Sequence, residues 1–148
     1  MKEKEWDISS LASLESAAAE ILALASEESR GTDAAVLLLH GDLGAGKTTF
    51  TQTLAGILKV EETVTSPTFV IAKSYETKHP RFKRLLHVDA YRVESVDELR
   101  ILGLSEEMGQ KDNIICIEWP ERAEGLFPQT ALRLYFELTA TGRKLTLR

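Results

Sequence analysis

The chain has 148 residues, 43% of them hydrophobic and 28% charged, and these values are typical of one soluble domain with one buried core. Its net charge of −5 argues against a surface that binds DNA stably. The single cysteine, Cys116, excludes a disulfide framework or a cysteine-based metal site, and its apolar surroundings predict a buried thiol.

Nothing in the sequence predicts insertion into a membrane. The first residues, MKEKEWDISS, lack the apolar segment of a signal peptide. No apolar run approaches the roughly 20 residues that a membrane span needs. We therefore expect a single cytoplasmic domain over residues 1–148 that makes no contact with a membrane.

The first half of the chain predicts a helix, a buried strand and a second helix. Residues 11–28 are rich in Ala, Leu and Glu, and their apolar positions, among them Leu14, Ile21 and Leu22, fall on one helical face. The run AAVLLLH that ends at His40 is apolar on both faces, which is typical of a central strand covered by helices. A glycine-rich turn follows it, and residues 47–58 predict the second helix.

The second half predicts strands that are partly antiparallel. VIAKSYE and RLLHVDAYR indicate two strands joined by the polar loop TKHPRFK. Ser95 and Glu98 form a capping box that starts a short helix, NIICIEW is a further buried strand, and the chain ends in a hairpin that turns near Thr141 and Gly142. The predicted fold is α/β: a three-layer sandwich like that of P-loop NTPases, with a mixed, partly antiparallel sheet and a C-terminal β-hairpin.

The turn after the first buried strand matches the phosphate-binding pattern G-x-x-x-x-G-K-[ST] at every required position. Its backbone amides and the start of the next helix would cradle phosphate oxygens. Lys47 would contact the β- and γ-phosphates, and the Thr48 hydroxyl would bind Mg²⁺. The residues of this glycine loop are Gly41, Asp42, Leu43, Gly44, Ala45, Gly46, Lys47 and Thr48.

Two carboxylates end apolar strands and are candidates for the remaining chemistry. Asp89 follows LLHV and Glu118 follows NIICI, and ligands of α/β sheets bind at such strand ends. One acid would hold Mg²⁺ and the other would orient water, and the sequence does not say which; either could instead be a solvated strand end paired with Arg92 or Arg122. In TSPTF, Thr68 is a candidate sensor of the γ-phosphate, and an ordinary Ser-Pro turn is the alternative.

The bound nucleotide is predicted to be ATP. A guanine-reading N-K-x-D motif is impossible, because the only asparagine, Asn113, precedes Ile-Ile-Cys. A small-molecule kinase is one alternative to an ATPase, but no arginine-rich lid lies between Asp89 and Glu118. A nucleotide-dependent adaptor that does not hydrolyse ATP is another. The basic run KHPRFKR, residues 78–84, is either a docking patch, for an acidic partner or for tRNA phosphates, or a solvated loop.

Taken together, HGDLGAGKTTF, TSPTF, HVDAYR with DELRILG, and IICIEWPERAEGLFP occur in the order of the TsaE (formerly YjeE) family, which the chain resembles over nearly its whole length. The resemblance implies an Mg²⁺-dependent ATPase that works in making threonylcarbamoyladenosine at position 37 of tRNA. It implies TsaD and TsaB as partners, whose complex slow ATP hydrolysis would reset, and contact with tRNA only through that complex.

The resemblance also assigns roles to single residues. The phosphate loop falls on Gly41 to Thr48, with Thr49 following, and the threonine of the switch-like segment on Thr68. Asp89 and Glu118 take the places of the family's two acids, with Glu118 the second Mg²⁺ contact beside Thr48, and Arg143 would reach the nucleotide. The first helix departs from the family, because Ser13 or Ser16 would have to replace a threonine near the adenine.

Overall fold

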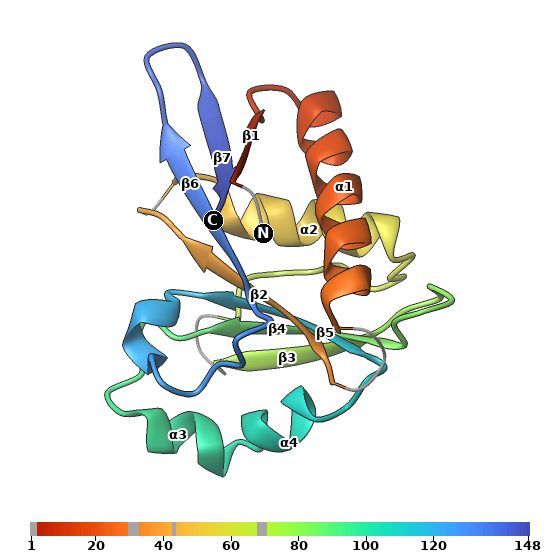
Figure 1. Cartoon of the computed structure of the whole chain (residues 1–148), viewed down its shortest axis with the longest axis vertical. Helices are drawn as coiled ribbons and strands as arrows, with labels where there is room; N and C mark the ends of the chain where they lie inside the picture. The colour runs from red at the N-terminus through yellow and green to blue at the C-terminus, as the bar shows by residue number, and fades with distance from the viewer. Residues whose placement is uncertain (1–2, 30–32, 43, 68–70) are drawn as a thin grey trace.

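The computed structural model describes residues 3–29, 33–42, 44–67 and 71–148 (Figure 1). Along the chain, α-helices of five to 19 residues are mixed with strands of four to seven residues. The elements are β1 Lys4–Asp7, α1 Leu11–Ser29, β2 Ala35–His40, α2 Lys47–Ile57, β3 Ala72–Glu76, β4 Arg84–Asp89, α3 Val96–Ile101, α4 Leu104–Met108, β5 Asn113–Glu118, the 3₁₀ helix η1 Pro120–Ala123, β6 Leu132–Leu138 and β7 Arg143–Leu147.

The strands form one mixed sheet in the order β1-β7-β6-β2-β5-β4-β3. Its centre is parallel, because β2 pairs in parallel with β5 and β6, and β5 pairs in parallel with β4. Its two edges are antiparallel, through β3 on β4 and through β7 between β6 and β1. This arrangement confirms the predicted α/β fold, its mixed sheet and its C-terminal hairpin.

The helices cover both faces of the sheet, so the molecule has three layers (Figure 1). Leu37 and Leu39 of β2 belong to the core beneath α1 and α2. Val36 and Leu38 point the other way, into the core beneath α3 and α4. Side chains alternate along a strand, so a continuous apolar run such as AVLLL supplies both cores at once.

The predicted helices and the capping box are confirmed, whereas β1 and α4 were not predicted. The Glu98 carboxylate accepts hydrogen bonds from the amides of Glu94 and Ser95 at the start of α3. The four residues of β1 are mostly exposed and charged, and the strand is held by its antiparallel pairing with β7, which leaves no hydrophobic pattern to detect. Among the described residues, no helix combines the length and apolar character that a membrane crossing requires.

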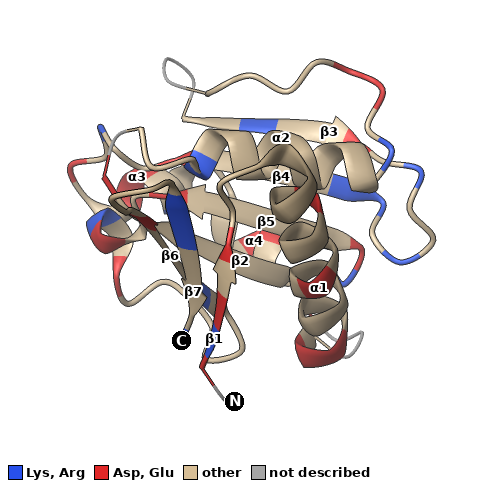
Figure 2. Cartoon of the chain, turned by 90° about the horizontal axis from the view of Figure 1, so that it is seen from above, with Lys and Arg blue, Asp and Glu red and all other residues tan. Residues whose placement is uncertain are grey.

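The basic loop between β3 and β4 is fastened to the fold by its own side chains. The Phe82 ring is fully buried, and Arg81 donates to the Ser29 hydroxyl at 2.9 Å. Lys78 forms an exposed ion pair with Glu61. Figure 2 shows acidic and basic residues interspersed over helices, strands and loops. Phe82 and Arg81 therefore anchor the loop to the fold, and docking of a partner by its basic residues stays a prediction.

Replacing Phe82 with alanine should lower the free energy of unfolding by about 3–5 kcal/mol, because a fully buried ring is lost and the cavity cannot fill. Urea denaturation followed by circular dichroism measures this. The control is Ile101→Ala, whose side chain is 85% exposed and should matter by less than about 0.5 kcal/mol. Similar losses in both variants would show that Phe82 does not anchor the loop.

Candidate nucleotide-binding site

The ends of three parallel strands and the start of α2 meet at one edge of the sheet. Leu39 of β2 lies opposite Glu118 of β5, and Glu118 lies opposite Asp89 of β4. The two predicted acids are therefore neighbours across a parallel ladder. The glycine loop leaves β2 at this edge and leads into α2, which begins at Lys47.

The backbone of the glycine loop takes conformations that only glycine adopts easily. Gly41 has φ 147° and Gly46, which precedes α2, has φ 109°. A Cβ atom on Gly41 would lie 2.6 Å from the carbonyl oxygen of Phe136 in β6. The loop thus passes so close to the neighbouring strand that a side chain at Gly41 would push it away.

The Lys47 side chain is folded into the loop. Its ammonium donates a hydrogen bond to the Gly41 carbonyl and lies 3.6 Å from the centroid of the Trp119 ring. Burial lowers the pKa of Lys47, and the nearby carboxylates of Glu118 and Asp89 act in the opposite direction. The cation is thereby held by a carbonyl and an aromatic face at the place where phosphate is predicted to bind.

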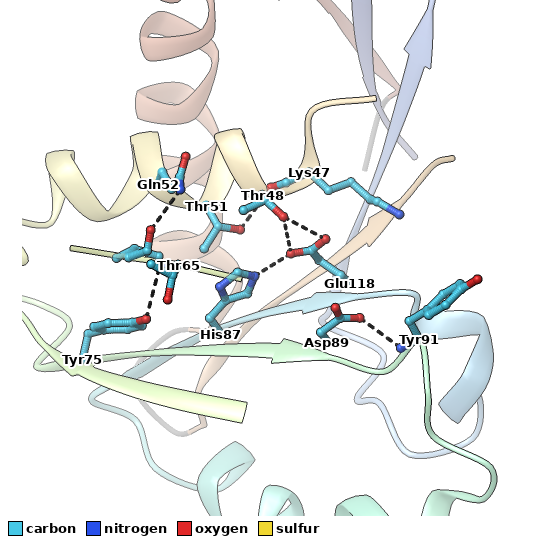
Figure 3. Close-up of polar contacts among 11 residues, drawn as sticks. Lys47, Thr48, Thr51, Gln52, Thr65, Tyr75, His87, Asp89, Tyr91 and Glu118 are labelled. Carbon is cyan, nitrogen blue, oxygen red and sulfur yellow. Dashed lines mark hydrogen bonds and ion pairs between the residues drawn. The ribbon is translucent and has the colours of Figure 1, made fainter. Parts of the chain in front are cut away.

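A short chain of polar contacts connects α2, β5 and β4 (Figure 3). The Thr48 hydroxyl lies 3.0 and 3.2 Å from the two carboxylate oxygens of Glu118. The nearer of these two oxygens, Oε2, also lies 2.6 Å from Nε2 of His87, which is fully buried. His87 was not predicted, although the alternation Leu85, His87, Asp89 places it on the face of β4 that carries the acid.

Asp89 makes a different contact. Its carboxylate accepts a hydrogen bond from the Tyr91 amide at 3.0 Å, so it closes the turn that leaves β4 (Figure 3). The Tyr91 ring packs on Trp119, with centroids 5.0 Å apart. Of the two acids, only Glu118 contacts Thr48 among the hydrogen bonds of the described residues. The two acids are therefore not equivalent in the structure: Glu118 lies beside Thr48, and Asp89 contacts Tyr91 instead.

A pocket of about 260 Å³ lies over the start of α2. Arg143 of β7 reaches it from the C-terminal hairpin, with its guanidinium 3.4 Å from the Gly44 carbonyl. The Arg143 amide donates to the Ser9 hydroxyl at 3.0 Å, which ties the hairpin to the segment before α1. The pocket is lined by Gly44, Gly46, Lys47, Thr48, Thr49, Glu118 and Arg143.

The other predicted residues lie around this pocket or outside the described residues. Asp42 and Thr49 are exposed, and Ala45 is buried. Leu43 and Thr68 belong to the residues that the structure does not describe, so their predicted roles stay predictions. Ser13 bonds to Ser10 at the start of α1, which occupies its hydroxyl in local capping.

Two further features of the described residues concern the thiol of Cys116 and the binding of metal ions. Cys116 is fully buried, and burial raises its pKa to about 12, so it is an inert part of the core. Within the ranges that the structure describes, no group of three or more His, Cys, Asp and Glu side chains is arranged to hold a metal ion.

The family model described as "Threonylcarbamoyl adenosine biosynthesis protein TsaE" matches residues 8–145. The chain belongs to the TsaE family. TsaE of Borreliella burgdorferi is 37% identical over 113 residues, which are 76% of this chain and 80% of that protein. TsaE of Bacillus subtilis is 44% identical over 100 residues, which are 67% of this chain and 59% of that protein.

A solved structure supports the fold of this TsaE family member. The crystal structure of Bacillus subtilis YdiB matches with a TM-score of 0.63 and 30% sequence identity, over 99% of this chain and 84% of that one. All of these relatives with a TsaE name are named for the biosynthesis of threonylcarbamoyladenosine in tRNA. The resemblance inferred from the motifs is thus confirmed at the level of family and fold.

Gly41→Ala should destabilise the protein by at least about 2 kcal/mol, because the new Cβ meets the Phe136 carbonyl at 2.6 Å and φ is positive. The matched control is Gly56→Ala in α2, where a Cβ has no neighbour within 4 Å and stability should rise by up to about 1 kcal/mol. Both values come from urea denaturation. An equal effect of the two substitutions would contradict the close approach.

Proposed function

We propose that the protein binds ATP with Mg²⁺ in the glycine-loop pocket and hydrolyses it slowly, and that this cycle resets a TsaD–TsaB complex that modifies adenosine 37 of tRNA. The observation that carries the proposal is the Thr48–Glu118 contact beside the buried Lys47. It joins a metal-binding hydroxyl, a carboxylate and a phosphate-binding cation at the end of parallel strands. The family membership supports the place in tRNA modification.

The hydrogen-bond donors and cations of the pocket fit a nucleoside triphosphate. The amides of the glycine loop and the start of α2 offer hydrogen-bond donors and partial positive charge to phosphate oxygens. Lys47 would exchange its contacts with the Gly41 carbonyl and the Trp119 face for the β- and γ-phosphates. Arg143 would reach the phosphates from the C-terminal hairpin.

The oxygens of Thr48 and Glu118 also fit Mg²⁺, which prefers hard oxygen ligands and keeps part of its coordination for phosphate and water. When bound, the ion would neutralise charge on the phosphate oxygens during hydrolysis. We assign Glu118 to this role because it contacts Thr48, and Asp89 to orienting the attacking water because it lies one strand further and is half-buried. Thr68 would sense the γ-phosphate.

We expect hydrolysis to be slow because of the position of Arg143, the arginine that lines the pocket. An arginine finger is typically worth about 10³–10⁵ in rate. Arg143 contacts the Gly44 carbonyl and lies on the loop, where it would bind phosphate rather than neutralise the transition state from the far side. A partner would therefore have to supply the missing donors, which connects turnover to the TsaD–TsaB complex.

The test of the proposed function is phosphate release from ATP, first with the protein alone and then with TsaD and TsaB. We expect weak release alone and stronger release with both partners, in each case only with Mg²⁺. Release that depends on a small acceptor molecule would instead establish a kinase. Binding without release in either condition would establish an adaptor that does not hydrolyse ATP.

Lys47→Ala should weaken ATP binding by about 100-fold or more, because it removes a positive charge from the phosphate site. This charge is already buried away from water in the structure. Isothermal titration calorimetry measures the affinity. The control, Lys83→Ala, removes an exposed lysine from the loop between β3 and β4 and should leave the affinity unchanged. Unchanged affinity in Lys47→Ala would refute the role of this lysine.

Glu118→Gln should abolish the Mg²⁺ dependence of nucleotide binding and the hydrolysis that requires it, because a neutral amide is a poor magnesium ligand. Asp89→Asn should keep the metal-dependent binding and lose only the turnover. The control is Glu62→Gln, which removes the negative charge of an exposed acid outside the pocket. If Asp89→Asn lost the metal dependence and Glu118→Gln kept it, the two assignments would have to be exchanged.

A further inference from the structure

His87 is a fully buried imidazole on β4 that points toward Glu118 (Figure 3). It lies opposite Cys116 in the parallel register, and its Nε2 atom is 2.6 Å from a carboxylate oxygen of Glu118. It does not line the pocket, and it is separated from Thr48 by the carboxylate. Any effect of His87 on the site must therefore pass through Glu118.

The contacts of Glu118 identify the donor of this hydrogen bond. Both carboxylate oxygens lie within reach of the Thr48 hydroxyl, at 3.0 and 3.2 Å, so the carboxylate is the acceptor on that side. We assign the imidazole proton to Nε2, which donates to Glu118. The other ring nitrogen, Nδ1, then carries a lone pair and has no hydrogen-bond partner within the described part of the chain.

The unpartnered Nδ1 has a consequence for what the imidazole does. A buried acceptor without a partner loses its hydrogen bonds to water and gains no hydrogen bond from the protein. Leu85, two residues earlier on the same face of β4, is fully buried in the core, and a leucine at position 87 would avoid that loss. The contact with Glu118 is the interaction that offsets the cost, and so it accounts for a histidine here.

Metal binding would leave the hydrogen bond from His87 to Glu118 in place. The Thr48 hydroxyl would offer a lone pair to the cation and re-aim its single hydrogen, so its present contact with both carboxylate oxygens would change. The imidazole contacts only Oε2 of Glu118, at 2.6 Å, and does not occupy Oε1. Such donors behind a metal ligand fix its orientation, and their loss typically costs about 10–100-fold in metal affinity.

We propose that His87 is a positioning residue for Mg²⁺: its Nε2–H holds the Glu118 carboxylate in the orientation that binds the ion beside Thr48. The proposal rests on the proposed function, because it concerns the metal of that same site. It adds a residue that touches neither nucleotide nor metal. The effect of His87 is confined to metal binding, so the affinity for nucleotide in the absence of metal should not depend on His87.

The test measures ADP binding by calorimetry in EDTA and then at increasing MgCl₂, with His87→Leu, His87→Asn and His87→Gln. The glutamine amide can reach the position of Nε2, whereas asparagine is too short and leucine has no donor. We expect leucine and asparagine to raise the Mg²⁺ concentration for half-maximal effect by about 10-fold or more. Glutamine should stay within about 3-fold of the wild type, and ADP affinity in EDTA should be equal in all variants.

A matched control separates positioning from stability. Leu86→Ala removes a buried side chain on the opposite face of the same strand, so it should lower the unfolding temperature without changing the Mg²⁺ midpoint. A wild-type midpoint in His87→Leu, or equal shifts in the glutamine and asparagine variants, would overturn the proposal. If His87→Leu does not fold, the comparison of glutamine with asparagine decides alone.

The same titration distinguishes the two levels of the account. If the wild type shows no Mg²⁺ dependence of ADP binding, the proposed metal site fails and the role of His87 fails with it. If the wild type shows the dependence and the His87 variants share its midpoint, the metal site stands and only the role of His87 is lost.

Discussion

The buried carboxylate of Glu118 is the constraint around which the rest of the site is arranged. A carboxylate removed from water needs hydrogen-bond donors or cations, and here they come from two separate elements, α2 and β4. Thr48 of α2 and His87 of β4 contact it, and the Lys47 ammonium is close enough for Glu118 to oppose the lowering of its pKa. The sheet register places β4 and β5 side by side, so the fold supplies these partners without a long loop.

Lys47 connects the glycine loop to the end of β5. Its ammonium lies between the Gly41 carbonyl and the Trp119 face, and Trp119 in turn packs on Tyr91 at the end of β4. Phosphate would replace contacts of modest strength with a stronger charge-assisted one, so the lysine need not be dehydrated when the nucleotide arrives. The positive φ of Trp119, 59°, directs its backbone into η1 just after Glu118.

The parts of the site that the sequence predicts are those tied to a local pattern. The glycine loop has a fixed spacing, Asp89 and Glu118 end apolar runs, and Ser95 with Glu98 marks a helix start. His87 escaped prediction because its role depends on the register between β4 and β5, which a single sequence does not reveal. The strand β1 escaped for a related reason, since backbone pairing with β7 holds it and its side chains are mostly exposed.

In the proposed function, Thr48 and Glu118 hold Mg²⁺ beside the phosphates of the nucleotide. The most direct measurement is a crystal structure of the protein with ADP and Mn²⁺ as a substitute for Mg²⁺, in which anomalous scattering locates the metal. We predict one metal peak within coordinating distance of the Thr48 hydroxyl and next to the Glu118 carboxylate, which contacts the metal directly or through one water. A peak coordinated by Asp89 instead, or ADP bound in the pocket with no metal peak, would contradict it.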